Sequence, residues 1–169
     1  MKNILRSELR SGFTLIELII VVAIIAIIAA TIFVALDPGK RLHVSRNSRR
    51  WADVTAVIKA VKLYETDNTG LPTEIDADAS TVQMLGTGSA CPPDSCTGVI
   101  FPASSCIISM TSTLSTYLKG IPLDPSNGTD TNTRYYINRN GGVLTVGACD
   151  SEGEGAGGSG TGPTISVSQ

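Results

Sequence analysis

Residues 13–36 read FTLIELIIVVAIIAIIAATIFVAL, and this stretch decides the architecture of the chain. No charged side chain occurs from Leu18 to Leu36, and an uninterrupted apolar run of about 18 residues or more is a candidate membrane span. As an α-helix, residues 13–36 would extend about 36 Å, which is enough to cross a hydrocarbon core of about 30 Å. A buried core helix is the alternative, but a chain of 169 residues is too small to cover such a helix on every side.

The segment before the span, residues 1–12, is basic. Lys2, Arg6 and Arg10 outnumber the single acid Glu8, as in the n-region of an export signal. A secretory signal peptide has an apolar segment of about 7 to 15 residues that ends at a small-residue cleavage site, whereas this apolar segment is longer and continues without such a site. We therefore expect no cleavage after the span.

The junction at residues 11–17, SGFTLIE, resembles the class III signal of type IV prepilins and type II secretion pseudopilins. The resemblance implies that prepilin peptidase, a membrane enzyme, cuts between Gly12 and Phe13 and methylates the new amino terminus of Phe13. Residues 1–12 would then be a cleaved leader, and residues 13–36 would be a transmembrane and assembly helix.

Glu17 is the only charged residue between Phe13 and Leu36. A carboxylate in hydrocarbon costs about 2.5 to 3.5 kcal/mol even on lenient insertion scales, so it needs a partner or a place at the membrane surface. The pilin resemblance implies that Glu17 pairs with the α-ammonium of Phe13 in a neighbouring subunit of the filament. The alternative is that Glu17 lies near the helix end and keeps its carboxylate among the lipid headgroups.

Basic residues flank the span on both sides, so the positive-inside rule does not orient it. One flank has Lys2, Arg6 and Arg10, and the other has Lys40, Arg41, Arg46, Arg49 and Arg50. The leader motif and the cysteines instead favour a carboxyl-terminal domain outside the cell. We expect a single-pass protein of the cytoplasmic membrane that later enters an extracellular filament.

A second helix is predicted over residues 37–69, because Pro38 should kink or restart the helix after the span. Apolar residues recur there mostly at spacings of three and four, the pattern of an amphipathic helix resting on a domain: Trp51, Val54, Val57, Ile58, Val61 and Tyr64. This helix should end near Thr69, with Gly70 as its terminator. The two helices and the Gly-Leu-Pro that follows resemble the long bent stem of the pilin family.

Charge is segregated along the chain. Residues 38–64 hold seven bases and one acid, whereas the residues from Glu65 onward hold eleven acids and three bases. This asymmetry favours complementary packing of stacked subunits. Two alternatives stay open: a solvated helix face, and a contact between residues 41–50 and anionic lipid headgroups before assembly.

Residues 70–150 form the predicted globular head, and at this size covalent cross-links are common. All four cysteines lie in it: Cys91, Cys96, Cys106 and Cys149. An even count in an extracytoplasmic domain predicts two disulfides, and we expect Cys91 to pair with Cys96 and Cys106 with Cys149. Zinc is the alternative, but Cys106 and Cys149 form no second close pair and the only histidine, His43, is far away in the stem.

The head should contain a small antiparallel β-sheet. The clearest element is a hairpin in which residues 135–137 and 143–146 flank Asn140-Gly141-Gly142. Weaker patterns predict short strands at residues 99–101 and 107–108, and a short helix or strand at residues 113–119. We therefore expect an α+β pilin fold, in which the long helix packs across the sheet.

Residues 151–169 are mostly glycine, serine and threonine, which predicts a flexible tail. The sequence after Gly147 resembles the calcium-binding end of the major type II secretion pseudopilin, and residues 121–125 resemble the loop before the last strands in pseudopilins and many pilins. Because calcium prefers clustered oxygen ligands, the candidate ligands are Asp124, Asp130, Asp150 and Glu152. The alternative is ordinary turn chemistry and solvated acids.

No catalytic constellation is visible, since His43 has no nucleophile, metal ligand or phosphate loop around it. A net charge of −2 does not indicate nucleic-acid binding. We expect a structural subunit of a type IV pilus-like filament, with no resident cofactor. Its expected partners are copies of itself, prepilin peptidase, the inner-membrane assembly machinery and, before assembly, the lipid bilayer. The alternatives are a major pseudopilin of a type II secretion system and a single-pass surface protein that never polymerises.

Overall fold

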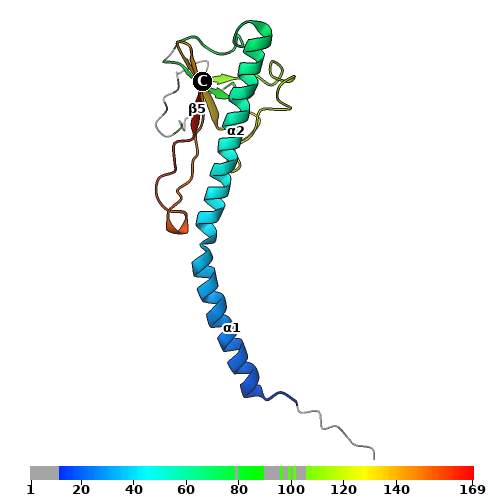
Figure 1. Cartoon of the computed structure of the whole chain (residues 1–169), viewed down its shortest axis with the longest axis vertical. Coiled ribbons are helices and arrows are strands. Elements are labelled where there is room, and N and C mark those ends of the chain that lie inside the picture. Colours follow the sequence, from blue (N-terminus) through cyan, green and yellow to red (C-terminus); the bar gives the residue numbers. More distant parts are fainter. Residues whose placement is uncertain (1–11, 79, 90–95, 97–98, 100, 102–105) are drawn as a thin grey trace, which may run out of the picture. The chain divides into compact units, whose positions relative to one another are not determined.

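The computed structural model describes residues 12–78, 80–89, 96, 99, 101 and 106–169 (Figure 1). The first eleven residues of the predicted leader lie outside this part of the chain. The chain divides into two compact units, residues 1–38 and residues 39–169, and each is described by itself. The first unit contains one helix, and the second contains a long helix and a β-sheet.

The helix of the first unit, α1 (Leu15–Leu36), begins with a side-chain cap. Thr14 has an extended backbone (φ −78°, ψ 151°), and its Oγ1 accepts a hydrogen bond from the backbone N–H of Glu17 at 3.3 Å. This bond satisfies one of the four N–H groups that have no partner at the start of a helix. None of the 22 residues of α1 is buried by the chain, and by length and composition the helix can cross a membrane.

The two helices are separated by Asp37, which has a left-handed backbone with φ 41° and ψ 70°. Helix α2 (Pro38–Asn68) starts at the next residue. Proline suits the first position of a helix because the N–H that it lacks would have no intrahelical partner. The predicted interruption at Pro38 is therefore confirmed.

Helix α2 ends at Asn68, as predicted, but its terminator is different. Thr69, not Gly70, adopts the left-handed conformation, with φ 58°. A β-branched residue is sterically strained in this region, where glycine would be at ease. The prediction of Gly70 as terminator was wrong by one residue.

One face of α2 is buried against the head. Val54, Val57, Ile58 and Val61 are 0% exposed, which confirms the predicted apolar stripe between residues 54 and 61. The prediction was wrong for Trp51, which is 41% exposed. Its place in the buried stripe is taken by the preceding residue, an arginine described below.

The sheet has five strands in the order β2-β1-β3-β4-β5. The strands are β1 (Val82–Leu85), β2 (Ile107–Ile108), β3 (Tyr135–Asn140), β4 (Val143–Ala148) and β5 (Ser166–Ser168), and a short 3-10 turn, η1 (Ala156–Gly158), precedes β5. All neighbouring strands are antiparallel except β1 and β2, which are parallel. The α+β fold class is confirmed, and the expected antiparallel sheet is antiparallel in all but this one pair.

The predicted hairpin is confirmed as β3 and β4. Asn140 pairs with Val143 at its tip, and Gly141 adopts the positive φ (60°) that such a turn requires. Farther along β4, a Cβ on Gly147 would collide with the ring of Tyr136 on β3, so only glycine fits at this place.

The core lies between α2 and the sheet, and Figure 1 shows α2 passing across the strands. Its members come from the second half of α2, from the sheet and from the segments that connect them: Val54, Val57, Ile58, Ala60, Val61, Ile75, Leu85, Met110, Leu114, Tyr135, Ile137, Leu144, Val146 and Ile165. The hydrophobic face of the sheet and the apolar stripe of α2 bury each other, and these contacts stabilise the sheet.

The predicted flexible tail is wrong. Residues 166–168 form β5 and pair with β4, where Val167 lies opposite Val146. The neighbouring Ile165 is 1% exposed and belongs to the core. Alternation of Ile165 and Val167 with serine is the pattern of a half-buried strand, and the glycine and serine content of the segment concealed it.

The remaining elements of the head agree with the predictions only in part. β1 was not predicted, because apolar and polar residues alternate only weakly in its sequence, VQML. The predicted strand at residues 107–108 is confirmed as β2, whereas the one at 99–101 lies partly outside the described residues. Residues 111–117 form turns, so the helix or strand predicted at 113–119 was wrong.

Candidate functional site

The predicted processing junction lies outside regular secondary structure, just before α1. Gly12 and Phe13 are both exposed, and the exposed fraction of Phe13 is 83%. No atom lies within 4 Å of the position that a Cβ on Gly12 would occupy. A peptidase can therefore reach the bond between these residues without opening any described element.

Glu17 lies in the first turn of α1, where the partial positive charge of the helix N-terminus favours a carboxylate. Its side chain is exposed. The ion pairs observed among the described residues do not include Glu17. Within the part of the chain that the structure describes, the backbone N–H of Glu17 is capped by Thr14, and its carboxylate has no side-chain cation beside it.

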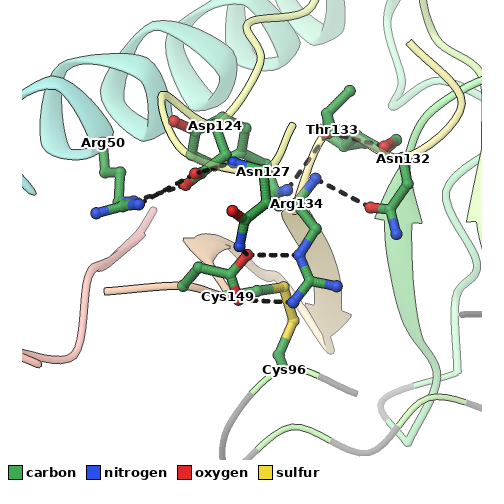
Figure 2. The surroundings of a disulfide bond; sticks show 11 residues. Arg50, Cys96, Asp124, Asn127, Asn132, Thr133, Arg134 and Cys149 are labelled. Atoms are coloured by element: carbon green, nitrogen blue, oxygen red, sulfur yellow. Dashed lines mark hydrogen bonds and ion pairs between the residues drawn. A yellow bond between two sulfur atoms is a disulfide. The ribbon is translucent and has the colours of Figure 1, made fainter. Parts of the chain in front are cut away.

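A second candidate site is built around Arg50 of α2, whose side chain is 0% exposed (Figure 2). Its Nε and Nη2 donate to Oδ2 and Oδ1 of Asp124 at 2.6 and 3.0 Å. Asp124 is also buried, and its Oδ1 accepts the backbone N–H groups of Ser126 and Asn127 at 2.8 and 3.2 Å. The carboxylate of Asp124 therefore holds Arg50 of α2 and also stabilises the turn at residues 124–127.

Sequence reasoning missed Arg50 as a site residue. The signal was present, since Arg50 lies four residues before Val54 and seven before Val57 and so continues the buried stripe. An arginine at a buried stripe position requires an acid on the facing element, because a buried charge without a partner is strongly destabilising.

Glu152 attaches the segment after β4 to the same part of α2. Its Oε2 accepts from Arg50 Nη1 at 3.0 Å, and its Oε1 accepts from Arg46 Nη1 at 2.8 Å. Asn47, 1% exposed, donates from Nδ2 to the backbone carbonyl of Glu152 at 2.7 Å and accepts the Glu152 N–H at 3.0 Å. Asn47 also accepts a hydrogen bond from Arg50 at 2.9 Å, so these groups form one connected network.

Residues 151–160, here called the C-terminal strap, follow α2 beyond this network. Nδ1 of His43 lies 2.9 Å from the carbonyl oxygen of Gly153. Nearer the start of α2, a Cβ on Gly39 would lie 2.9 Å from the carbonyl oxygen of Gly157, so the two backbones approach as closely as glycine allows. The strap therefore covers the half of α2 that has no apolar stripe.

The network shifts the proton affinities of its members. Burial alone would raise the pKa of Asp124, but the hydrogen bonds from Arg50 outweigh it and hold this pKa below its usual value. The same balance lowers the pKa of Glu152, with Arg50 and Arg46 as the donors. Burial would lower the pKa of Arg50, and its two carboxylate partners raise it instead. All three groups are therefore charged at neutral pH.

A neighbouring half-buried acid, Asp53, contacts β3. Its Oδ2 accepts a hydrogen bond from the hydroxyl of Tyr135 at 2.8 Å. Burial raises the pKa of Asp53, and it also raises the pKa of Tyr135, to which the hydrogen bond with Asp53 adds. This bond is a second polar link between α2 and the sheet.

The predicted pairing of the cysteines is wrong. Cys96 is bonded to Cys149, with a Cα–Cα distance of 4.4 Å (Figure 2). Cys106 is also disulfide-bonded, and Cys91 lies outside the described residues. The prediction joined cysteines that are close in sequence, whereas the fold brings Cys96 to the end of β4 in a small cluster with Met84.

Three of the four candidate calcium ligands are paired with arginine. Asp124 and Glu152 bind Arg50, and Asp150 binds Arg134 through two hydrogen bonds of 2.5 and 2.6 Å. Asp130 is exposed and its carbonyl oxygen accepts from Thr87. Within the described ranges, no three His, Cys, Asp or Glu residues are grouped so that they could hold a metal ion. A calcium ion would have to compete with these arginines for the same oxygens.

Comparison with protein families identifies one segment. The model of the prokaryotic N-terminal methylation motif matches residues 9–33 of the 169-residue chain. The chain carries a type IV pilin-like class III signal. No curated protein and no solved structure matches the chain.

The type IV pilin-like signal coincides with the features found at the start of the chain. It covers the exposed junction at Gly12 and Phe13, the cap at Thr14, Glu17 and most of α1. This match supports a type IV pilin-like or pseudopilin-like precursor, and the motif is typical of a family of structural subunits. The apolar α1 fits a membrane-anchored pilin.

Proposed function

We propose that the mature protein, residues 13–169, is a structural subunit of a type IV pilus-like surface filament. The observation that carries the proposal is the methylation motif at residues 9–33, which includes most of α1, a helix with no residue buried by the chain. A fully exposed apolar helix requires lipid or other helices around it. Membrane insertion surrounds α1 with lipid, and packing in a filament then surrounds it with the helices of other subunits.

In this proposal prepilin peptidase cuts between Gly12 and Phe13 and methylates Phe13. Cleavage creates an α-ammonium only four residues before Glu17 in sequence. The ammonium of an incoming subunit compensates Glu17 of a subunit already in the filament, which removes the cost of an uncompensated carboxylate in an apolar surrounding. The inner-membrane assembly machinery supplies the subunits from the bilayer.

The second unit, which contains α2 and the head, is displayed outside the cytoplasmic membrane. The disulfide of Cys96 and Cys149 supports this placement, since disulfides persist mainly in oxidising compartments. Ion pairs and the apolar core hold the head on α2.

The proposal is tested on the purified filament fraction and on the membrane fraction of the same cells. Amino-terminal sequencing should give a methylated Phe13 as the first residue. Glu17→Leu should leave membrane insertion intact and abolish sheared filaments, because breaking a buried pair by removing one partner costs about 3 to 5 kcal/mol. Thr31→Val, which removes a polar atom from α1 without changing charge, is the matched control and should polymerise normally.

A mature protein that starts at Met1 would contradict the proposal and would favour a single-pass surface protein that does not polymerise. A start at Phe13 with normal filament yield from Glu17→Leu would refute the charge pairing alone.

A major pseudopilin of a type II secretion system is the second candidate. It is favoured by the loop at residues 121–125, which resembles that of pseudopilins and whose Asp124 is fixed on Arg50 of the stem. Deletion of the chain distinguishes the two functions. Loss of surface filaments with normal secretion supports the pilus, and loss of protein secretion supports the pseudopilus.

A further inference from the structure

Opposite its buried stripe, α2 has an exposed side with a charge of one sign. We call it the outer face and define it by Ser45, Arg49, Ala52, Lys59 and Leu63, which recur at spacings of three, four and seven and are all exposed. The side chain of Arg49 is 63% exposed, and Leu63 is 54% exposed. The outer face extends about 27 Å along the helix.

The outer face keeps its positive charge, whereas the other side of α2 does not. Arg46 and Arg50 are neutralised within the chain by Glu152 and Asp124. Among the described residues, the ion pair of Arg49 is a long contact to Asp53, 3.8 Å across one helical turn, and an exposed pair of this kind is weak. The strap thus covers one set of bases and leaves Arg49 and Lys59 to solvent.

The opposite charge gathers at the other end of α2. Residues 62–80 contain five acids, Glu65, Asp67, Glu74, Asp76 and Asp78, and a single base, Lys62, which already contacts Glu65 at 3.0 Å. Asp76 and Asp78 are exposed, and the Asp78 N–H donates to Asp76 Oδ1 at 2.9 Å, which fixes the turn that presents them. The buried Ile75 anchors this turn on the core.

These two charged regions are separated along one chain. From Arg49 to Asn68 the helix rises about 28 Å, and among the described residues the ion pair found for Arg49 is with Asp53 and not with the acidic turn. The attraction between the two regions is therefore available to a contact between chains. Since the two surfaces differ, their contact is heterologous, and a heterologous contact that does not close into a ring generates an open polymer.

We propose that the outer face of α2 docks onto the acidic turn at residues 74–78 of a second copy of this chain. The inference rests on the proposed filament and names its contact outside the apolar α1 helices. Arg49 and Lys59 steer the incoming copy and fix its register, and Leu63 supplies apolar contact.

The experiment uses full-length protein with normal processing. One variant combines Arg49→Glu with Lys59→Glu, a second combines Asp76→Lys with Asp78→Lys, and a third carries all four changes. Like charges facing each other should lower sheared-filament yield about tenfold or more in each of the first two variants. The four changes together should restore yield, because the pairs are then reversed and again complementary. Arg139→Glu, on the hairpin, is the control for an isolated charge reversal and should leave the yield unchanged.

The single tryptophan gives an independent measurement. Trp51 is 41% exposed at the edge of the outer face, so its quenching by acrylamide should be lower in wild-type filaments than in detergent-solubilised monomers. Equal quenching in the two states would overturn the docking surface.

The remaining outcomes separate the possible occupants. If the first variant loses filaments and the four changes together do not restore them, a second copy is not the occupant of the outer face. Binding of the wild-type monomer to anionic but not to neutral vesicles would then identify lipid headgroups as the occupant. Normal yield in both reversed variants would also overturn it while the filament function stands. Failure of wild-type protein with a Phe13 terminus to form filaments would refute the proposed function itself. Cys96–Cys149 bond formation in every variant confirms that the head has folded.

Discussion

Replacing Arg50 with methionine removes the cation that holds the lower part of α2 to the head. Methionine has a similar length and no charge, so the packing of the aliphatic stem is largely kept. The carboxylate of Asp124, which is 4% exposed, would lose two hydrogen bonds of 2.6 and 3.0 Å and keep only its backbone donors. Glu152 would keep Arg46.

Removing one partner of a buried ion pair costs about 3 to 5 kcal/mol, because the other charge is left without compensation. Asp124→Ala should cost a similar amount for the same reason, with the charge now left on Arg50. For a unit of this size such a loss lowers the melting temperature by about 10–20 °C. The double variant Arg50→Met/Asp124→Ala should lose clearly less than the sum of the two, since neither charge remains.

Unfolding in denaturant is measured on the full chain in detergent through the fluorescence of Trp51, the only tryptophan, which lies next to Arg50 on α2. Arg49→Met is the matched control, because it removes an exposed arginine from the same helix. A loss below about 1 kcal/mol for Arg50→Met, as at an exposed pair, would refute the role of a buried anchor. Strict additivity in the double variant would refute the direct coupling of the two residues.

Three further changes test other parts of the fold. Thr69→Gly should stabilise the second unit by about 0.5 to 1 kcal/mol in denaturant unfolding, because it relieves a left-handed β-branched residue; a destabilised variant would contradict that strain. Substituting Cys96 and Cys149 together by serine should cost about 4 kcal/mol by the entropy of a loop with a sequence separation of 53, and an unchanged melting temperature would show that the bond does not constrain the unfolded chain. The lowered pKa of Glu152 means that its contribution is present above the ordinary glutamate value near 4 and is lost as pH falls through the lowered value. Glu152→Gln should therefore be about 1 to 2 kcal/mol less stable than wild type at pH 7 and equal to it near pH 2, and a constant difference across that range would contradict the ion pair with Arg50.

The parts of the fold that follow from local patterns were predictable. Residues 13–36 had to form an exposed apolar helix, and Pro38 had to start another, because composition and backbone chemistry decide both. The hairpin followed from Asn140-Gly141-Gly142 and its apolar flanks. The class III signal was also recognisable without any knowledge of tertiary structure, and it is the basis of the proposed processing site.

Parts that depend on partners distant in sequence were not predictable in this way. Arg50 is separated from Asp124 by 74 residues and from Glu152 by 102, and no local pattern joins them. The disulfide likewise joins Cys96 to a residue 53 positions away, whereas a prediction from spacing preferred near neighbours. β5 was missed because only three residues pair in it, too few for their alternation to outweigh the glycine and serine around them.

Helix α2 is attached to the head in two different ways along its length, and this division has a consequence for assembly. Between Val54 and Val61 an apolar stripe packs on the sheet, and such packing tolerates small shifts when the total volume is kept. Between His43 and Arg50 the contacts are directional, because the fork of Arg50 fits one carboxylate on Asp124 and another on Glu152 only in a narrow range of positions. The polar half therefore fixes the rotation of α2 about its own axis, and with it the direction in which the outer face points. The variant with all four charge reversals is compared in two backgrounds, wild type and Arg50→Met, at a temperature where both heads stay folded. If filaments are restored in the wild-type background but not with Arg50→Met, then Arg50 contributes the orientation of α2 and not only stability. Equal rescue in both backgrounds would show that the apolar stripe suffices to orient the helix.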